Sequence, residues 1–391
     1  MMSNLEQLIE GILTQPTAPF RESWPKRACL SFCEDLRLPV YEDSTGNLWI
    51  NAKNAKEARN ASLVFVAHLD HPGIVITKFT QSRGKIFAHG TWLGGGPMDI
   101  RNFDVKVFSD VNALMVFDGV VKKHTKGPRG PKDVVIEIKP SPLAQAACTP
   151  QGLEALGLWG ACLWYQRHDV PQGITRRDGM WVTKAADDLI GVCALIHGLK
   201  RAGRPRGVVA LLTRAEESGF HGTIEVLQQR LLDPKKTLMV SIETSSQLPG
   251  AELGKGPVVR LGDRSTVFDP ALVYWVQTQA AQLAAHDKNF RYQRRVMDGG
   301  SCEASAFNLY GFRVAGVSTP LKNYHNMGAK NRPEPEAVGT SDVEQLTTLI
   351  AALMKNHKRS DVKNIGRVAF EKYTKALLDN QRSHRKYFDG Y

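Results

Sequence analysis

Four consecutive segments, DDLIGVCALIHGLKRAG (187–203), GVVALLTRAEESG (207–219), HGTIEVLQQRLL (221–232) and TLMVSIETSS (237–246), alternate between two hydrophobic patterns. The first and third segments space their apolar residues at helical intervals, whereas the second and fourth begin with continuous apolar runs. A continuous apolar run is typical of a buried parallel strand, because such a strand is covered on both faces. The alternation therefore predicts a sheet whose strands are linked by helices.

Segments of the same kind lie on both sides of this block. They are two strands, LVFVAHLD (63–70) and GFRVAGVSTPL (311–321), and two helices at about 269–285 and 341–358. The last helix begins with Ser341 and Asp342, which are typical helix caps. The predicted fold class is α/β, with a mixed, mostly parallel sheet and helices on both of its faces.

Residues 78–183 have a different texture. Short alternating runs such as VKVFSD (105–110) and VVIEIKP (134–140) are interrupted by Gly and Pro, and helical periodicity is weak. We therefore predict that this block is a small β-rich domain inserted into the α/β fold. The main domain would then consist of residues 1–77 and 184–358, followed by a polar tail at 359–391.

The composition is that of a soluble globular protein. The 391 residues are 42% hydrophobic, and no stretch reaches the roughly 20 apolar residues of a membrane-spanning helix. The N-terminus lacks the basic start and the unbroken apolar run of a signal peptide. Six scattered cysteines without a CxxC pair favour buried free thiols in a reducing compartment: Cys29, Cys33, Cys148, Cys162, Cys193 and Cys302. We therefore expect a cytoplasmic protein without a membrane partner.

The formal net charge of +12 is compatible with an acidic partner. The basic residues form only short clusters in loops and in the tail, and no nucleic-acid-binding module accompanies them. A solvated basic surface is the simpler interpretation, so no nucleic-acid partner is expected.

Carboxylate and imidazole side chains gather where the predicted strands end or the helices begin. They are His68, Asp70, Asp187, Glu216, Glu217, Glu243 and His325. Taken singly, such residues are explained by a satisfied strand-end histidine, a helix cap or a solvated carboxylate. Because loops at the C-terminal edge of an open α/β sheet converge on one crevice, the seven side chains together predict a common site. Imidazole with carboxylate suits zinc, cobalt or manganese better than calcium.

Five stretches, taken in order, resemble the co-catalytic metallopeptidases of clan MH. They are HLDHPGIVI (68–76), GTWLGGGPMDI (90–100), KAADDLIG (184–191), AEESGFHG (215–222) and GGSCEASAFNLYGFRVAGVSTPLKNYH (299–325). The chain is most similar to the glutamyl/deblocking aminopeptidase family, whose members assemble as tetrahedral dodecamers. The resemblance covers almost all of residues 15–355 and implies a zinc-peptidase-like fold with an inserted β-domain.

The resemblance implies a role for each of the seven side chains. Asp187 would bridge two divalent metal ions. His68 and Glu243 would complete the protein ligands of one ion, and Glu217 and His325 those of the other. Glu216 would be the general base. Asp70 would hydrogen-bond the far nitrogen of His68 and so fix the tautomer of that ring.

The chemistry of peptide hydrolysis agrees with these roles. Two dications about 3.5–4 Å apart lower the pKa of a shared water from ~15.7 towards 7. Glu216 cannot usefully be both ligand and base, so its neighbour Glu217 would bind metal while Glu216 carries the proton to the leaving amine. The cofactors expected are two divalent ions for each subunit, with zinc favoured and cobalt or manganese as alternatives.

Several positions depart from the family pattern. Glu243 stands where the dodecameric aminopeptidases usually carry Asp, and Glu is common there in related carboxypeptidases and deacylases. His71 and Pro72 replace an acidic–apolar pair, and Asn326 and Met327 replace the usual Ser–Pro. These departures predict a divergent substrate pocket.

Three functions remain open on this sequence. The first is a metal-dependent aminopeptidase that removes N-terminal residues from short peptides. The second is a deacylase or carboxypeptidase-like two-metal hydrolase of N-acyl amino acids, and the third is a non-catalytic binding protein that keeps the fold. The resemblance also implies a homo-oligomer, either a dodecamer or a dimer, with the β-domain making subunit contacts.

Overall fold

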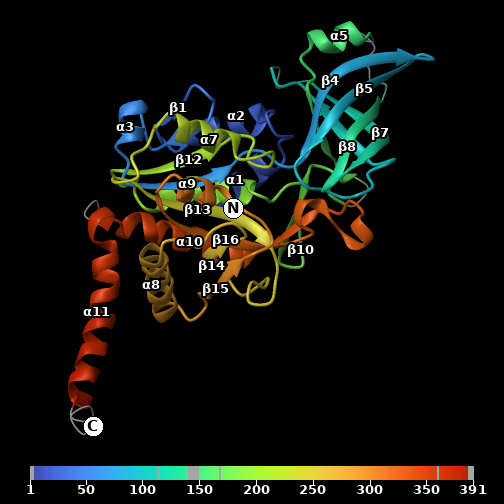
Figure 1. Ribbon diagram of the computed structural model, residues 1–391. Coiled ribbons are helices and arrows are strands. Elements are labelled where there is room, and N and C mark those ends of the chain that lie inside the picture. Colours follow the sequence, from blue (N-terminus) through green and yellow to red (C-terminus); the bar gives the residue numbers. More distant parts are fainter. Residues whose placement is uncertain (1–3, 112–114, 140–148, 167–168, 359–360, 386–391) are drawn as a thin grey trace.

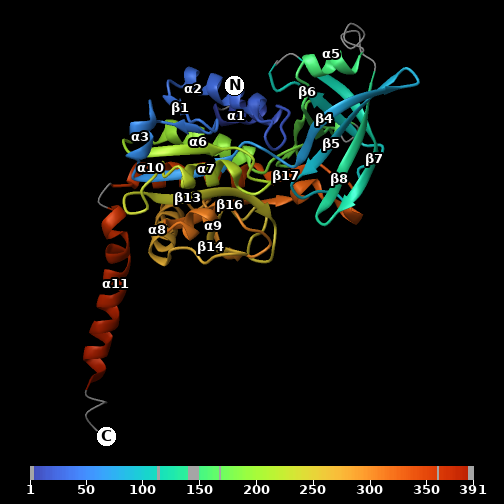
Figure 2. The same cartoon turned by 45° about the horizontal axis from the view of Figure 1, so that its top comes forward.

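The computed structural model describes residues 4–111, 115–139, 149–166, 169–358 and 361–385, and it contains two bodies built on separate sheets (Figure 1). One body is a large mixed sheet with helices, and the other is a closed β-barrel that lies to one side of it in both ribbon views (Figures 1 and 2). The predicted α/β fold class with a small β-rich domain is confirmed.

The large sheet is parallel in its centre and antiparallel towards both edges. Its strands, in spatial order, are β1 (Val40–Glu42), β2 (Leu48–Ile50), β12 (Val208–Thr213), β3 (Leu63–His68), β13 (Leu238–Ser246), β16 (Arg313–Lys322), β17 (Glu336–Gly339), β11 (Met180–Thr183) and β10 (Ile174–Arg177). β14 (Val258–Asp263) pairs with β16 and with β15 (Gln293–Met297). The three central pairs β12–β3, β3–β13 and β13–β16 are parallel, so the C-terminal ends of these strands share one edge.

Helices α6 (Leu189–Arg201), α8 (Pro270–His286), α9 (Glu303–Leu309) and α10 (Thr340–Asn356) pack on strands of the large sheet and bury their apolar runs. Further helices are α1 (Asn4–Leu13), α2 (Ser23–Asp35), α3 (Ala55–Arg59), α7 (His221–Gln228) and α11 (Asp361–His384), with α5 (Pro150–Ala155) beside the barrel. Every residue of β3 and β12 is buried, so both faces of these strands are covered, as their continuous apolar sequences predict. The core therefore holds the strand ends rigidly.

The N-terminus of α10 departs from the sequence prediction. The helix begins at Thr340, and its N-cap residue is Gly339, which makes no side-chain cap hydrogen bond. The Asp342 carboxylate instead accepts the backbone N–H groups of Gly254 and Gly256, at 2.7 and 2.8 Å. The expected Ser341/Asp342 cap is therefore wrong, because the turn at 254–256 uses the carboxylate.

The barrel is antiparallel and has a hydrophobic core of its own. Its strands, in order around the barrel, are β4 (Gly73–Ser82), β5 (Lys85–Leu93), β8 (Gly130–Ile138), β7 (Val116–Gly127), β6 (Asp104–Phe108) and β9 (Gly160–Leu163). Strand β11 pairs with β17 of the large sheet and β10 pairs with β11, so neither belongs to the barrel. The domain limits at 77/78 and 183/184 stay a prediction, and the barrel pairing itself spans residues 73–163.

The C-terminal helix α11 projects away from both bodies (Figures 1 and 2). Its positions 374–385 are exposed, and residues 359–360 and 386–391 of the predicted tail lie outside the described part of the chain. Five cysteines are buried and free, whereas Cys148 lies outside the described residues. Among the described helices, none combines the length and the hydropathy needed to cross a bilayer.

Candidate metal centre

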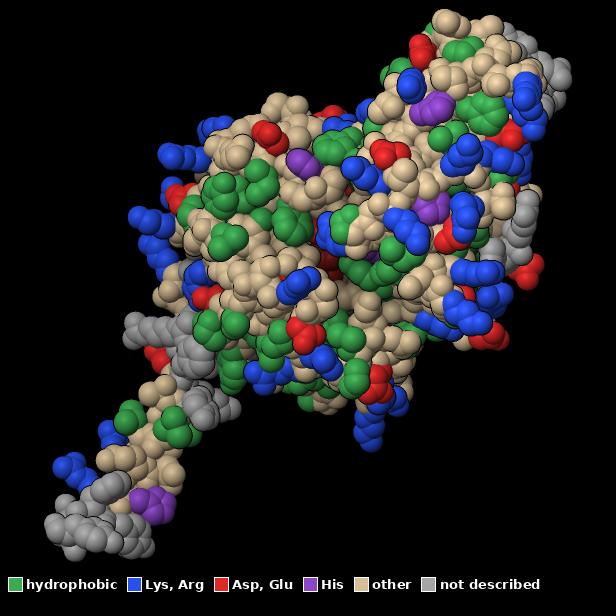
Figure 3. Space-filling view, turned by 45° about the vertical axis from the view of Figure 1, so that its right-hand side comes forward, with side chains coloured by type: hydrophobic (Ala, Val, Ile, Leu, Met, Phe, Trp, Pro, Cys, Tyr) green, Lys and Arg blue, Asp and Glu red, His purple; other side chains and the backbone are tan. Residues whose placement is uncertain are grey.

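The predicted side chains come together at the C-terminal edge of the parallel strands. His68 is the last residue of β3, Glu216 and Glu217 follow β12, Glu243 lies near the end of β13, Asp187 precedes α6, and His325 lies in the turn after β16. All of these residues are at most 8% exposed except Glu217, which is partly buried. In the space-filling view, acidic side chains are visible at the bottom of a hollow near the centre of the molecule (Figure 3).

Asp187 lies between the two histidines. Its Oδ1 atom is 3.5 Å from Nε2 of His68, and its Oδ2 atom is 3.5 Å from Nε2 of His325. The same Nε2 atom of His325 is 3.0 Å from Oε1 of Glu217. Each carboxylate oxygen of Asp187 therefore faces a different imidazole, which is the arrangement that a bridging ligand needs.

The donor atoms form two triads that share Asp187. One triad is His68, Asp187 and Glu243, and the other is Asp187, Glu217 and His325; within each, the donor atoms lie within 4.8 Å of one another. A further grouping of the same kind joins His68, Glu216 and Glu217. The two triads that share a carboxylate match the donor set of a paired divalent site.

Three buried donor atoms test this fit. Oδ1 of Asp187, Oε1 of Glu217 and Nε2 of His325 have no hydrogen-bond partner, although they face other side chains of the cluster at 3.0–3.5 Å. Buried polar atoms are normally hydrogen-bonded, and unpaired ones that converge on a common point are those of a metal or ligand site. The residues present therefore fit a pair of divalent cations.

The electrostatics of the cluster also favour a bound cation. Burial raises the pKa of Glu243 to about 8, although the charge of Arg260 opposes this rise, and burial raises the pKa of Glu216 well above its usual range. For His325, burial alone would lower the pKa, but the charge of Glu217 outweighs it and raises the value to about 10. A cluster of buried carboxylates whose charges repel one another is stabilised by positive charge at its centre.

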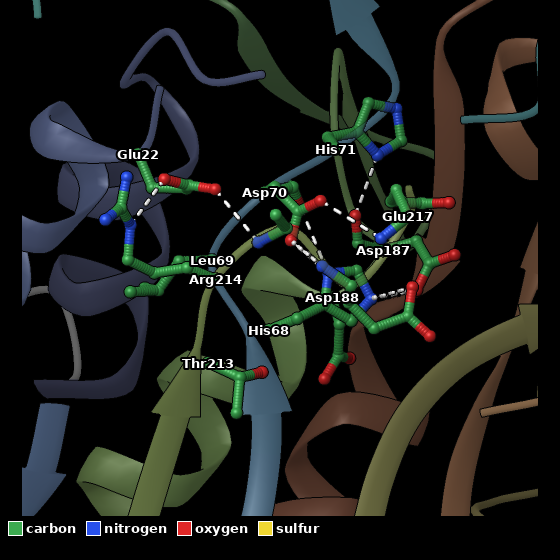
Figure 4. A network of polar contacts seen from close by, with 12 residues as sticks. Glu22, His68, Leu69, Asp70, His71, Asp187, Asp188, Thr213, Arg214 and Glu217 are labelled. Carbon is green, nitrogen blue, oxygen red and sulfur yellow. Dashed lines mark hydrogen bonds and ion pairs between the residues drawn. The ribbon is translucent and has the colours of Figure 1, made fainter. Parts of the chain in front are cut away.

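Asp70 contacts the His68 ring and also the loop that carries the two glutamates. The Nδ1 atom of His68 lies 3.1 Å from the backbone carbonyl oxygen of Asp70, whereas the nearest oxygen of the Asp70 carboxylate is 3.5 Å away. That carboxylate accepts the backbone N–H groups of Glu216 and Glu217, at 2.9 and 3.1 Å (Figure 4). The main hydrogen bonds of the Asp70 side chain therefore hold the Glu216–Glu217 loop, and the backbone carbonyl orients His68.

Two further residues support this loop, and sequence reasoning missed both. Glu22 is fully buried, and its carboxylate accepts Nε–H of Arg214 at 2.8 Å and the backbone N–H of Ala215 at 3.0 Å (Figure 4). Glu22 precedes a helix and Arg214 follows a strand. Acidic and basic residues are common at such positions, so no sequence motif marks these two.

The His325 ring is held from two sides. The ring of Tyr324 stacks on it, with ring centroids 3.7 Å apart. Gly95, in the loop after β5 of the barrel, lies so close that a Cβ atom there would overlap Nδ1 of His325. The glycine-rich stretch of the barrel therefore forms one wall of the site.

The comparisons with known proteins agree with this geometry. The sequence profile described as M42 glutamyl aminopeptidase matches residues 46–332, a range that contains all seven predicted site residues. An aminopeptidase from Desulfurococcus kamchatkensis matches with a TM-score of 0.69 and 18% identity over 92% of this chain and 97% of its own. The TET1 peptidase of Pyrococcus horikoshii matches with a TM-score of 0.67 and 21% identity over 90% of this chain and 100% of its own.

A TET aminopeptidase from a marine sediment archaeon of the Thaumarchaeota gives a TM-score of 0.70 at 18% identity, covering 93% of this chain and 100% of its own. All three identities are below 25%, so these structural matches establish a common fold. The profile match covers well over half of the chain and includes the strand ends that carry the candidate ligands.

Proposed function

The chain belongs to the M42 peptidase family, and on this premise we propose that it is a metal-dependent aminopeptidase that removes N-terminal residues from short peptides. The observation that carries the proposal is the position of Asp187, whose two oxygens each face one histidine within a buried, acid-rich cluster. Asp187 joins two complete donor triads. A mononuclear or purely structural site would not need this arrangement.

We propose that His68, Asp187 and Glu243 hold one divalent ion and that Asp187, Glu217 and His325 hold the other. Zinc suits a set of imidazoles and carboxylates, with cobalt and manganese as alternatives. When bound, the pair would supply Lewis acidity towards the scissile carbonyl and a lowered pKa for a shared water.

Glu216 is the proposed general base. It is adjacent in sequence to the ligand Glu217, and its Oε2 atom is 4.0 Å from Nε2 of His68, at the edge of the cluster. The Asp70 carboxylate fixes the backbone of both glutamates, so the two side chains take different positions on one rigid loop. Glu216 would take a proton from the attacking water and deliver it to the leaving amine.

A panel of peptides with free and blocked N-termini tests the substrate class. With zinc-loaded protein, release of the first residue from free peptides and none from their N-acetylated forms is expected. Turnover of N-acyl amino acids alone would replace the proposal with the deacylase alternative, which the presence of Glu243 keeps open. Absence of turnover on every substrate, with both metals bound, would favour a binding protein that keeps the fold.

We propose that the subunits form a homo-oligomer. The Pyrococcus horikoshii TET1 peptidase can assemble into a tetrahedron or a large octahedral shell, and this chain spans the full length of that protein. Subunit contacts through the barrel and a dodecameric state are the expectation, with a dimer as the alternative. Size-exclusion chromatography with light scattering distinguishes these masses.

A cytoplasmic location is part of the same proposal, supported by the five buried free thiols among the described residues. In Figure 3, Lys and Arg side chains are scattered over the right-hand side of the molecule, with Asp and Glu side chains between them. We interpret this as a solvated basic surface, with peptides and not nucleic acid as the partners.

Gly95→Ala is expected to lower kcat/KM at least about tenfold, because the added methyl group would push His325 out of its donor position. The measurement is peptide turnover together with metal content at limiting zinc. Gly299→Ala is the matched control, since a Cβ atom there has no heavy atom within 4 Å. Equal losses in the two variants would contradict a specific contact between the barrel loop and His325.

A further inference from the structure

Glu336 hydrogen-bonds to two loops that each carry a candidate ligand. The side chain is fully buried on β17. Its Oε2 atom accepts the backbone N–H groups of Ala186 and Asp187, at 2.6 and 3.2 Å, and its Oε1 atom accepts that of His325, at 2.8 Å. Glu336 is not a member of either donor triad, and it lies beyond the segment matched by the family profile.

The sheet topology explains why one residue reaches both loops. β17 lies between β11 and β16, with Glu336 opposite Thr183 and Ala337 opposite Lys322. The chain leaves β11 towards Asp187 and leaves β16 towards His325. Glu336 is therefore at the point where the two ligand loops start to diverge from the sheet.

The His325 loop depends on such an anchor. Asn323, His325 and Asn326 all have positive φ angles, of 61°, 53° and 59°. Left-handed backbone at non-glycine residues is strained and persists only where the surrounding structure enforces it. Hydrogen bonds to a carboxylate are among the stronger ones. The bond from the His325 N–H to Glu336 fixes the backbone of the candidate ligand His325.

A second connection reinforces the same pair of loops. Nδ1 of His71 lies 2.7 Å from the backbone oxygen of Asp187, and its Nε2 atom lies 3.0 Å from Oδ1 of Asn326. The Nδ2 group of Asn326 donates in turn to the backbone oxygen of Lys184 at 3.0 Å. His71 and Asn326, two positions that depart from the family pattern, are thus hydrogen-bonded to each other, and the Asp187 backbone is held at both its N–H and its carbonyl.

We propose that Glu336 is a positioning residue for the metal pair. Its carboxylate holds Asp187 and His325 at the separation that one cation requires. This inference rests on the proposed function. Glu336 makes no hydrogen bond to the backbone of His68 or Glu243, which belong to the rigid strands β3 and β13. Loss of the Glu336 carboxylate therefore affects the Asp187–Glu217–His325 triad more than the His68–Asp187–Glu243 triad.

Zinc titration of the apo-protein against a chromophoric chelator, without peptide, measures this effect. Wild type is expected to bind two equivalents. Glu336→Gln leaves a carboxamide that can accept from one loop only, and one equivalent is expected to weaken about 10–100-fold while the other changes less than about threefold. Glu336→Asp keeps the buried carboxylate, but its side chain is too short to reach both loops. It is therefore expected to weaken the binding of the same zinc equivalent. This variant tests the inference if Glu336→Gln fails to fold.

Glu334→Gln is the matched control, because it makes the same chemical change two residues before Glu336, where the carboxylate accepts the Ala329 N–H and, among the described residues, no N–H of a candidate ligand. Two equivalents of wild-type affinity in folded Glu336→Asp, or equal weakening of both equivalents, would overturn the inference and leave the proposed function intact. Wild-type protein that binds no zinc would overturn the proposed function itself. Wild type that binds two equivalents without cleaving any peptide would overturn the proposed activity but not the positioning role.

Discussion

Replacement of Glu216 by glutamine is expected to lower kcat about 10²–10⁴-fold and to leave the content of bound divalent metal unchanged. Glutamine has nearly the same shape but cannot accept the proton of an attacking water. The backbone N–H of residue 216 would still donate to Asp70, so the loop is expected to keep its conformation. The effect would therefore fall on the proton-transfer step and not on metal binding or folding.

The measurement is steady-state turnover of a short peptide with metal analysis of the same preparation. Glu217→Gln provides the contrast, because Oε1 of Glu217 faces His325 in the second triad and its loss is expected to remove metal as well as activity. Unchanged kcat in Glu216→Gln would exclude this residue as the base, whatever the fate of the metals.

The sequence predicted the candidate site well where strands determine it. The apolar runs at 63–68 and 208–213 are typical of buried parallel strands, which the structure confirms, and parallel neighbours end at a common edge. His68, Glu217 and the other predicted ligands therefore meet for a reason that is visible in the hydrophobic pattern.

The supporting residues could not be predicted in the same way. Asp70, Glu22 and Glu336 act mainly by accepting backbone N–H groups of other loops, and the positions of those groups depend on the complete fold. No local pattern marks an acid as an acceptor for such a loop, which is more than a hundred residues away for Asp70 with Glu216, Glu22 with Ala215 and Glu336 with Ala186. For the same reason the hydrogen bonds of the Asp70 carboxylate to the Glu216–Glu217 backbone were not predicted, although that carboxylate also lies 3.5 Å from Nδ1 of His68.

The barrel shows a further limit of sequence reasoning. Alternating runs between Gly and Pro identified strands, but they did not identify the pairing order, which skips from β5 to β8 and closes through β9. The partnership between Gly95 and His325 arises only from how the barrel lies against the large sheet. The consequence is a site with one wall from each body, so that a substitution at Gly95 in the barrel loop is expected to alter catalysis without replacing a ligand.

Asp187→Asn is expected to weaken the binding of both metal equivalents by at least about 100-fold, and so to abolish measurable peptide turnover. The reason is that Asp187 is the one residue common to both triads, with Oδ1 directed to the side of His68 and Oδ2 to the side of His325. An amide nitrogen cannot replace the second oxygen as a ligand. Zinc titration and peptide turnover, measured on the same preparation, check the two parts of this prediction.

The adjacent Asp188→Asn is a closely matched control. The Asp188 carboxylate is fully buried, and its Oδ1 atom accepts the hydroxyl of Thr244 at 3.0 Å, a bond that an asparagine oxygen keeps. This variant is therefore expected to retain both metals and most of the turnover. If Asp187→Asn lost only one zinc equivalent, the remaining triad would hold its cation without Asp187 as a bridging ligand. The site would then consist of two independent metal sites and not of a pair that shares Asp187.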